Sequence, residues 1–178
     1  MPAAVQDAWF NEPVAVLPFS NRTNSVTAPD TLRGMAAGML RGMGYRTVPL
    51  PDIDARLRMK GVTLGDQLVT MSATQLAEAV GARRLVWGGV EEFGVVNVGI
   101  YYRRDVRVGF VLRDGNGREL WRCTGEGFRE VASDNPGGTF LGGLIGGALE
   151  RATRSYLKEE SEQAVISALL TLPSRPRR

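Results

Sequence analysis

The spacing of hydrophobic residues changes several times along the chain, and each change marks an element. A nearly continuous apolar run, Pro13–Phe19, is typical of a buried strand. Asp30 then stands where a helix N-cap is expected, and Gly44 stands where a helix ends. Between them apolar residues recur three and four positions apart, which predicts a helix; they are Leu32, Met35, Ala36, Met39, Leu40 and Met43.

Three glycines, Gly34, Gly38 and Gly42, lie four residues apart on this predicted helix. Each glycine weakens a helix by roughly 1 kcal/mol relative to alanine. Because they share one face, we expect another backbone, of the sheet or of a partner, to pack closely against them.

The next segment predicts a second strand and two short helices. Tyr45–Leu50 has the composition of a strand, and Asp52–Lys60 that of a short helix. Ser72–Gln75 is a capping box that opens a helix running through Val80, and Gly81 ends that helix.

Strand patterns dominate the following forty-odd positions. Arg84–Val90 is apolar, and Asp105–Arg113 alternates between apolar and polar residues. Asp114–Gly117 is a hairpin turn, and Arg118–Phe128 returns as its partner strand. A final helix is expected to end before Pro173.

The resulting order, β-α-β-α-β-β-β-α, predicts an α/β fold with one mixed sheet and helices packed on it. We expect an N-terminal extension at residues 1–12, a single domain at residues 13–173 and a basic tail at residues 174–178. A chain of 178 residues buries a sufficient core without disulfides.

Composition removes several kinds of chemistry. The chain has no histidine and a single cysteine, Cys123, so it cannot build a Ser-His-Asp triad, a His-ligated metal site or an intramolecular disulfide. No phosphate-binding glycine motif is present. Catalysis by carboxylates, lysine or tyrosine stays open on composition alone. We assign no catalytic, cofactor-binding or metal-binding residues, and that the protein is not an enzyme is what the family resemblance given below implies.

Charge argues against nucleic acid as a partner. The net charge of +3 equals the three arginines of the tail, so the body carries 3 − 3 = 0. Five arginines form either a local patch or ordinary solvated strand ends: Arg83, Arg84, Arg103, Arg104 and Arg107.

The acidic residues leave a second hypothesis open. Most of the acidic pairs fall at element ends and turns, where acids are normally solvated and structural roles are usual: Asp52 and Asp54, Glu91 and Glu92, Glu159 and Glu160, and Asp114. A deep pocket that gathered Asp52, Glu91 or Asp114 beside an arginine would instead indicate a cytoplasmic ligand-binding protein or a carboxylate-dependent enzyme.

A glycine-rich apolar segment, Thr139–Leu149, has small residues four apart. As a helix it would rise only about 16 Å, too little to span a bilayer. It is either a buried helix start or a surface for self-association or lipid contact. For partner or lipid contact we select its large apolar residues and two tyrosines in a second apolar stretch, Gly94–Arg104: Phe140, Leu141, Leu144, Ile145, Tyr101 and Tyr102.

Five segments, taken in order, resemble a family of small outer-membrane lipoproteins that share the fold of the TolB amino-terminal domain and of the curli-secretion protein CsgG; PelC, a polysaccharide-export lipoprotein, is a relative of the same kind. The segments are Val14–Asn21, Leu76–Ala82, Leu85–Val90, Leu112–Trp121 and Gly142–Gly146.

The resemblance implies a periplasmic protein held at the inner leaflet of the outer membrane by a lipidated cysteine. It implies an accessory in assembly or export that forms a homo-oligomer, as PelC forms a ring collar, and that contacts other envelope proteins. No cysteine precedes Pro2, so we expect that a signal peptide and the lipidated cysteine have been removed. Gly94–Arg104 is about half the length that two membrane-crossing strands require, so we do not expect a pore.

Replacing Leu144 and Ile145 with aspartate is expected to abolish self-association and leave the fold intact, because a charge opposes burial of an apolar contact. Light scattering coupled to size-exclusion chromatography measures the mass. An unchanged mass and function would contradict this assignment.

Overall fold

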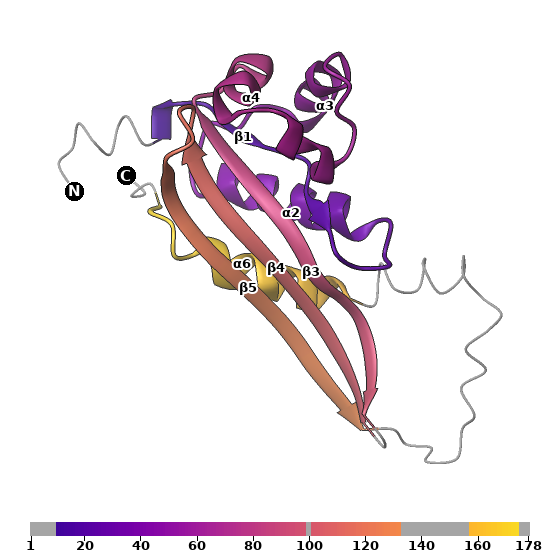
Figure 1. Ribbon diagram of the computed structural model, residues 1–178. Coiled ribbons are helices and arrows are strands. Elements are labelled where there is room, and N and C mark those ends of the chain that lie inside the picture. The colour runs from indigo at the N-terminus through magenta and orange to yellow at the C-terminus, as the bar shows by residue number, and fades with distance from the viewer. Residues whose placement is uncertain (1–9, 99–100, 133–156, 175–178) are drawn as a thin grey trace.

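The computed structural model describes residues 10–98, 101–132 and 157–174, and these form a mixed sheet with helices on both faces (Figure 1). The sheet contains β1 (Val14–Val16), β2 (Ser20–Asn21), β3 (Arg84–Val98), β4 (Tyr101–Asp114) and β5 (Glu119–Ala132). Its order is β1-β3-β4-β5, with β2 beside β3. Strands β1 and β2 run parallel to β3, whereas β3, β4 and β5 form an antiparallel meander. The predicted mixed α/β fold is confirmed.

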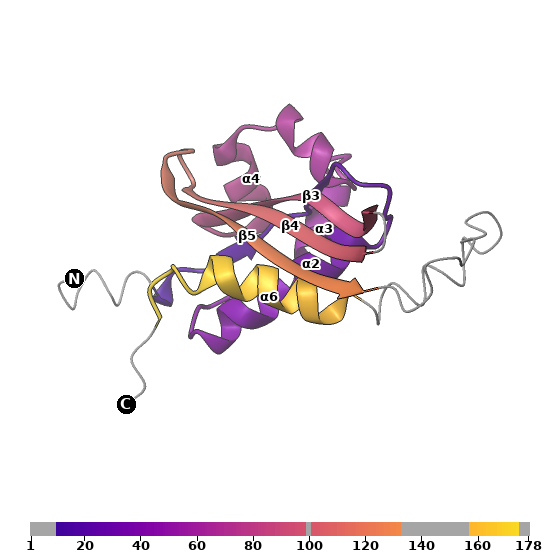
Figure 2. The same cartoon turned by 90° about the horizontal axis from the view of Figure 1, so that it is seen from below.

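Two layers of helix cover the sheet (Figure 2). On one side, which we call the covered face, lie α2 (Ala28–Gly42) and α6 (Lys158–Leu169). On the other side, the opposite face, lie α3 (Leu50–Arg58), the 3-10 helix η1 (Gly65–Thr70) and α4 (Ala73–Val80). Each layer has its own hydrophobic core, and the larger one is under α2 and α6.

The capping residues predicted from the sequence mark both ends of α4 but not the start of α2. The Ser72 hydroxyl accepts a hydrogen bond from the Gln75 amide at 3.2 Å, and the Gln75 side chain accepts one from the Ser72 amide. Gly81 ends α4 in the left-handed conformation, with φ at 69°. Helix α2 starts at Ala28, earlier than predicted: Thr27 is its N-cap and Asp30 lies in its first turn, because the proline at position 29 favours a helix start.

The predicted strand at Tyr45–Leu50 is not formed. Only Thr47 pairs, in an isolated bridge to Val14, and Leu50 already belongs to α3. Pro49 and Pro51 have no amide hydrogen to donate to a ladder, whereas proline suits a first helical turn. The observed order is therefore β1-β2-α2-α3-η1-α4-β3-β4-β5-α6.

The meander strands are longer than the alternation in the sequence predicts. Each spans 14 or 15 residues. We call the far ends of these strands the arm: residues 92–98, 101–107 and 126–132, which pair with one another across the three strands. Helix α6 lies against part of the arm on the covered face, and the strands extend past the helix (Figure 1).

Close backbone packing occurs on β5 rather than on the glycine stripe of α2. A Cβ atom built on Gly34 or Gly42 would meet nothing within 4 Å, so the sheet does not pack against that stripe as expected. On β5, in contrast, a Cβ atom at Gly125 would overlap the carbonyl oxygen of Ala164, and one at Gly127 would overlap that of Glu160. Helix α6 therefore rests directly on the β5 backbone.

Gly125→Ala is expected to lower the free energy of unfolding by about 2–3 kcal/mol, because the added methyl group forces α6 away from the sheet. Urea unfolding measures this loss. The matched control is Gly94→Ala in β3, where a Cβ atom meets nothing within 4 Å. The control is expected to leave stability unchanged or raise it by a few tenths of a kcal/mol, since glycine weakens a strand. Equal losses in both variants would contradict the packing role of Gly125.

Candidate interaction surface

The opposite face of the meander carries a row of charged side chains beyond the α3–η1–α4 layer. Val106, Val108, Phe110 and Leu112 are buried toward the covered face. Because side chains alternate along a strand, the residues between them point to the opposite face. Arg103, Asp105 and Arg107 of β4 lie there, beside Glu126 and Phe128 of β5.

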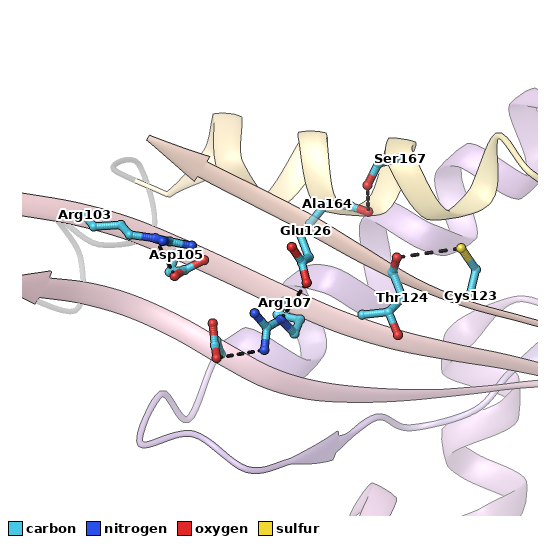
Figure 3. A network of polar contacts seen from close by, with 9 residues as sticks. Arg103, Asp105, Arg107, Cys123, Thr124, Glu126, Ala164 and Ser167 are labelled. Atoms are coloured by element: carbon cyan, nitrogen blue, oxygen red, sulfur yellow. Dashed lines mark hydrogen bonds and ion pairs between the residues drawn. The ribbon is translucent and has the colours of Figure 1, made fainter. Parts of the chain in front are cut away.

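Ion pairs join these charges across all three strands. Arg107 lies between two carboxylates, with Nη1 at 3.1 Å from Glu92 and Nε at 2.9 Å from Glu126. The charge of Glu92, and then that of Glu126, raises the pKa of Arg107. Arg103 Nε lies 2.9 Å from Asp105 (Figure 3), and its guanidinium stacks over the Phe128 ring at 5.1 Å. The arm thus presents charges that are already paired.

A β-bulge places Glu92 in this network. The register of β3 against β4 shifts between Val90 and Glu92, so that Glu92 stands directly opposite Arg107. In the sequence, Glu91 and Glu92 are only an acidic pair at a strand end. No signal in the sequence marks the bulge, because it depends on the pairing with β4.

Four of the five arginines that the sequence left open as a patch or as solvated strand ends have separate ion-pair partners. Arg84 Nε lies 3.1 Å from a Glu12 oxygen, and Arg104 Nη1 lies 3.7 Å from Glu160. Arg103 and Arg107 pair within the network on the opposite face. Arg83 is exposed and precedes β3. Consecutive strand residues point to opposite faces, so arginines that are close in sequence separate in space.

A hollow of about 650 Å³ lies between η1 and the meander. Trp87, Gly89 and Gly109 belong to its lining, together with Asp66 and Glu91. Of the carboxylates in the enzyme hypothesis, Glu91 lines the hollow. Three arginines also line it: Arg22, Arg113 and Arg122.

The other acidic residues have structural partners. Asp54 pairs with the buried Arg33 at 2.7 Å. Asp114 accepts hydrogen bonds from the amides of Asn116 and Arg118, which hold the predicted hairpin turn. Asp52 lies in the first turn of α3.

One hollow-lining arginine is itself paired. Arg122 Nη2 lies 2.6 Å from Glu119. The hydrogen bond from Arg122 lowers the pKa of Glu119, and the pair raises the pKa of Arg122. Arg113 stacks over the Trp87 ring at 5.2 Å. These arginines brace the edge of the hollow.

The selected contact residues occupy two regions. Tyr101 and Tyr102 begin β4 in the arm, where they pair with Val98 and Asn97. Phe140, Leu141, Leu144 and Ile145 lie outside the described residues. Their assignment as partner or lipid contacts stays a prediction, as does the division of the chain at residues 12 and 173.

The part of the chain that the structure describes holds no group of three or more metal-ligating side chains. Within the same ranges, no helix is long and apolar enough to cross a membrane.

Comparison with known proteins identifies a family to which the chain is similar. The family model described as "Putative lipoprotein GNA1162-like" matches residues 10–175. No curated protein matches the chain. The predicted resemblance to a lipoprotein family is confirmed, and the family model is more specific than the expected likeness to TolB and CsgG.

Solved structures agree on the fold. Lipoprotein GNA1162 from Neisseria meningitidis is 18% identical, with a TM-score of 0.62, covering 82% of this chain and 94% of that one. A dodecamer of a PelC variant from Paraburkholderia phytofirmans is 21% identical, with a TM-score of 0.53 over 92% and 89%. A second PelC dodecamer from the same organism is 22% identical, with a TM-score of 0.52 over 93% and 89%.

Replacing Arg122 with glutamine is expected to raise the pKa of Glu119 toward the ordinary glutamate value, because its main hydrogen-bond donor is lost. The lowered pKa means that the pair stabilises the fold above the ordinary glutamate pKa and loses this effect as the pH falls through the folded-state value. Carboxyl NMR titration measures the change. Arg118→Gln is the control, since Arg118 pairs with Asp114, and an equal shift in the control would refute the assignment.

Proposed function

The chain belongs to the GNA1162-like lipoprotein family, and from this premise we propose that it is a non-catalytic accessory domain of the bacterial cell envelope. In this proposal the protein resides in the periplasm, held at the outer membrane by a lipid anchor. It self-associates and assists the assembly or export of a surface component.

The observation that carries the proposal is the arm, whose charged side chains form ion pairs with one another. Three strands of 14 or 15 residues extend past α6 (Figure 1). The side chains on their opposite face range from 14% exposed at Asp105 to 54% exposed at Glu126. Arg107 and its two carboxylates cross-link β3, β4 and β5, which holds this face in one geometry. A preorganised surface loses little entropy when a partner binds it. Phe128, which is 52% exposed, supplies an apolar contact among the charges.

Self-association draws support from the PelC structures, which are dodecamers with the same fold. Because those chains are only 21% and 22% identical to this one, the likeness concerns the fold, and oligomerisation of this chain is our proposal. We propose the face of the arm as the contact between copies. Tyr101 and Tyr102 would extend that contact at one end, and Phe140, Leu141, Leu144 and Ile145 would provide a second contact with a partner or with lipid.

A small-ligand site is the second candidate function, and the hollow beside η1 favours it. Glu91 lies there with three arginines in the same lining. Two of those arginines are engaged, Arg113 with Trp87 and Arg122 with Glu119. This engagement supports a structural role and makes the interaction surface the stronger proposal.

The double variant Arg103→Ser, Phe128→Ser is expected to reduce the mass in solution toward the 19.3 kDa of one chain, because it removes the stacked cation and ring from the arm. The mass is followed by light scattering over a range of concentrations. The control is Ile166→Ser, Leu170→Ser, which removes exposed apolar residues from the C-terminal end of α6 and is expected to keep the wild-type mass. A monomeric wild type, or an equal loss in the control, would contradict the proposed surface.

A further inference from the structure

The connection from α3 to η1 exposes three large aliphatic side chains within eleven residues. Met59 is 79% exposed, Leu64 62% and Val69 88%. Single exposed apolar residues are ordinary on protein surfaces, but three within eleven positions are a local concentration. Val69, which belongs to η1, also lines the hollow beside the meander. The segment that carries them, residues 58–70, is called the α3–η1 turn below.

The turn is held rigidly, so its aliphatic side chains are presented outward rather than left loose. The Val62 amide donates to the Leu57 carbonyl at 3.0 Å. The Gln67 side-chain oxygen accepts from the amides of Thr63 and Leu64, at 2.8 and 3.0 Å. Val62 and Leu68 are buried and anchor the turn in the core under α3 and α4.

Two cations flank Met59 in the turn. Residues 58–70 contain Arg58 and Lys60 against one acid, Asp66, which gives 2 − 1 = +1. Arg56 donates to the Val80 carbonyl at 2.6 Å, and Arg58 and Lys60 are exposed. Aliphatic residues that enter the acyl boundary, flanked by cations that meet phosphate, are the chemistry of an interfacial membrane contact.

We propose that the α3–η1 turn is a membrane-contact site that docks the domain on an anionic phospholipid surface. Charge complementarity supports this occupant, since the local excess of positive charge matches anionic headgroups. A protein partner fits less well, because the turn contains no aromatic residue and a stable interface takes roughly 800 Å² from each side. The turn lies on the face of the sheet opposite α6 (Figure 2), so this contact leaves α6 free.

This inference goes beyond the proposed function, because it concerns contact between the folded domain and lipid, independent of self-association. The experiment is co-sedimentation of the full, unlipidated chain with vesicles. One set of vesicles is phosphatidylcholine alone, and the other is phosphatidylcholine with one-third phosphatidylglycerol.

Wild-type protein is expected to sediment with the anionic vesicles and to be released by salt. The variant Arg58→Gln, Lys60→Gln is expected to partition about 25-fold less, at about fivefold for each basic residue near the surface. The variant Met59→Ser, Leu64→Ser, Val69→Ser is expected to lose at least about tenfold, because three side chains no longer enter the acyl boundary.

The matched control is Val26→Ser, Ile166→Ser, Leu170→Ser, which removes three exposed aliphatic residues elsewhere and is expected to bind like wild type. Thermal unfolding checks that each variant is folded. No sedimentation of wild type with anionic vesicles, or an equal loss in the control, would overturn the proposal. It would also be overturned if the aliphatic variant bound vesicles normally and changed only the mass in solution, since the turn would then contact another copy.

Discussion

Helix α6 rests with its backbone on β5, and the covered face of the sheet depends on this contact. Gly125 and Gly127 permit it, because any larger residue would overlap the carbonyl oxygens of the helix. The helix then brings Ala164, Val165 and Ala168 into the core that buries the apolar side of β4. Without that cover, Val106, Val108 and Phe110 would face water on a strand of an otherwise complete meander. The glycines thus lower the local strand propensity and, in return, allow the C-terminal helix to close the fold.

Charge on β4 is divided between the two faces by the same strand geometry. Arg104 points toward α6, where the carboxylate of Glu160 is 2% exposed and lies 3.7 Å away. A buried carboxylate requires an opposite charge, so this pair favours one position of α6 on the sheet. Arg107 points to the other face and joins Glu92 and Glu126 there. One arginine-rich strand therefore helps to seat the helix on one side and braces an exposed surface on the other.

The elements that the sequence predicts correctly have local determinants. Ser72, Gln75 and Gly81 define a helix through contacts within ten residues, and the turn at Asp114 depends on its own side chain. Features with distant determinants are not predicted. The α2 glycines form the more regular pattern in the sequence, yet of these two sets only Gly125 and Gly127 receive another backbone, because α6 packs there from more than thirty residues away. The bulge at Glu92 and the division of the arginines likewise depend on register, which alternation alone does not fix. The strand predicted at Tyr45–Leu50 is wrong for another reason: two prolines outweigh the strand-like composition of the segment.

The residues that pack the core differ from the exposed residues that we propose as contacts. The covered face is occupied by the packing of α2 and α6, and the residues that make that packing are small or buried. The exposed apolar side chains that we propose as contacts lie on the opposite side, at Phe128 in the arm and at Met59, Leu64 and Val69 in the α3–η1 turn. Each of these sites has contacts that hold it in place. The Arg103 guanidinium stacks on the Phe128 ring in the arm, and the Gln67 side chain accepts a hydrogen bond from the Leu64 amide in the turn. Both proposed contact surfaces lie on the opposite face of the sheet, so a partner could bind either of them without disturbing the packing of α2 and α6 on the covered face.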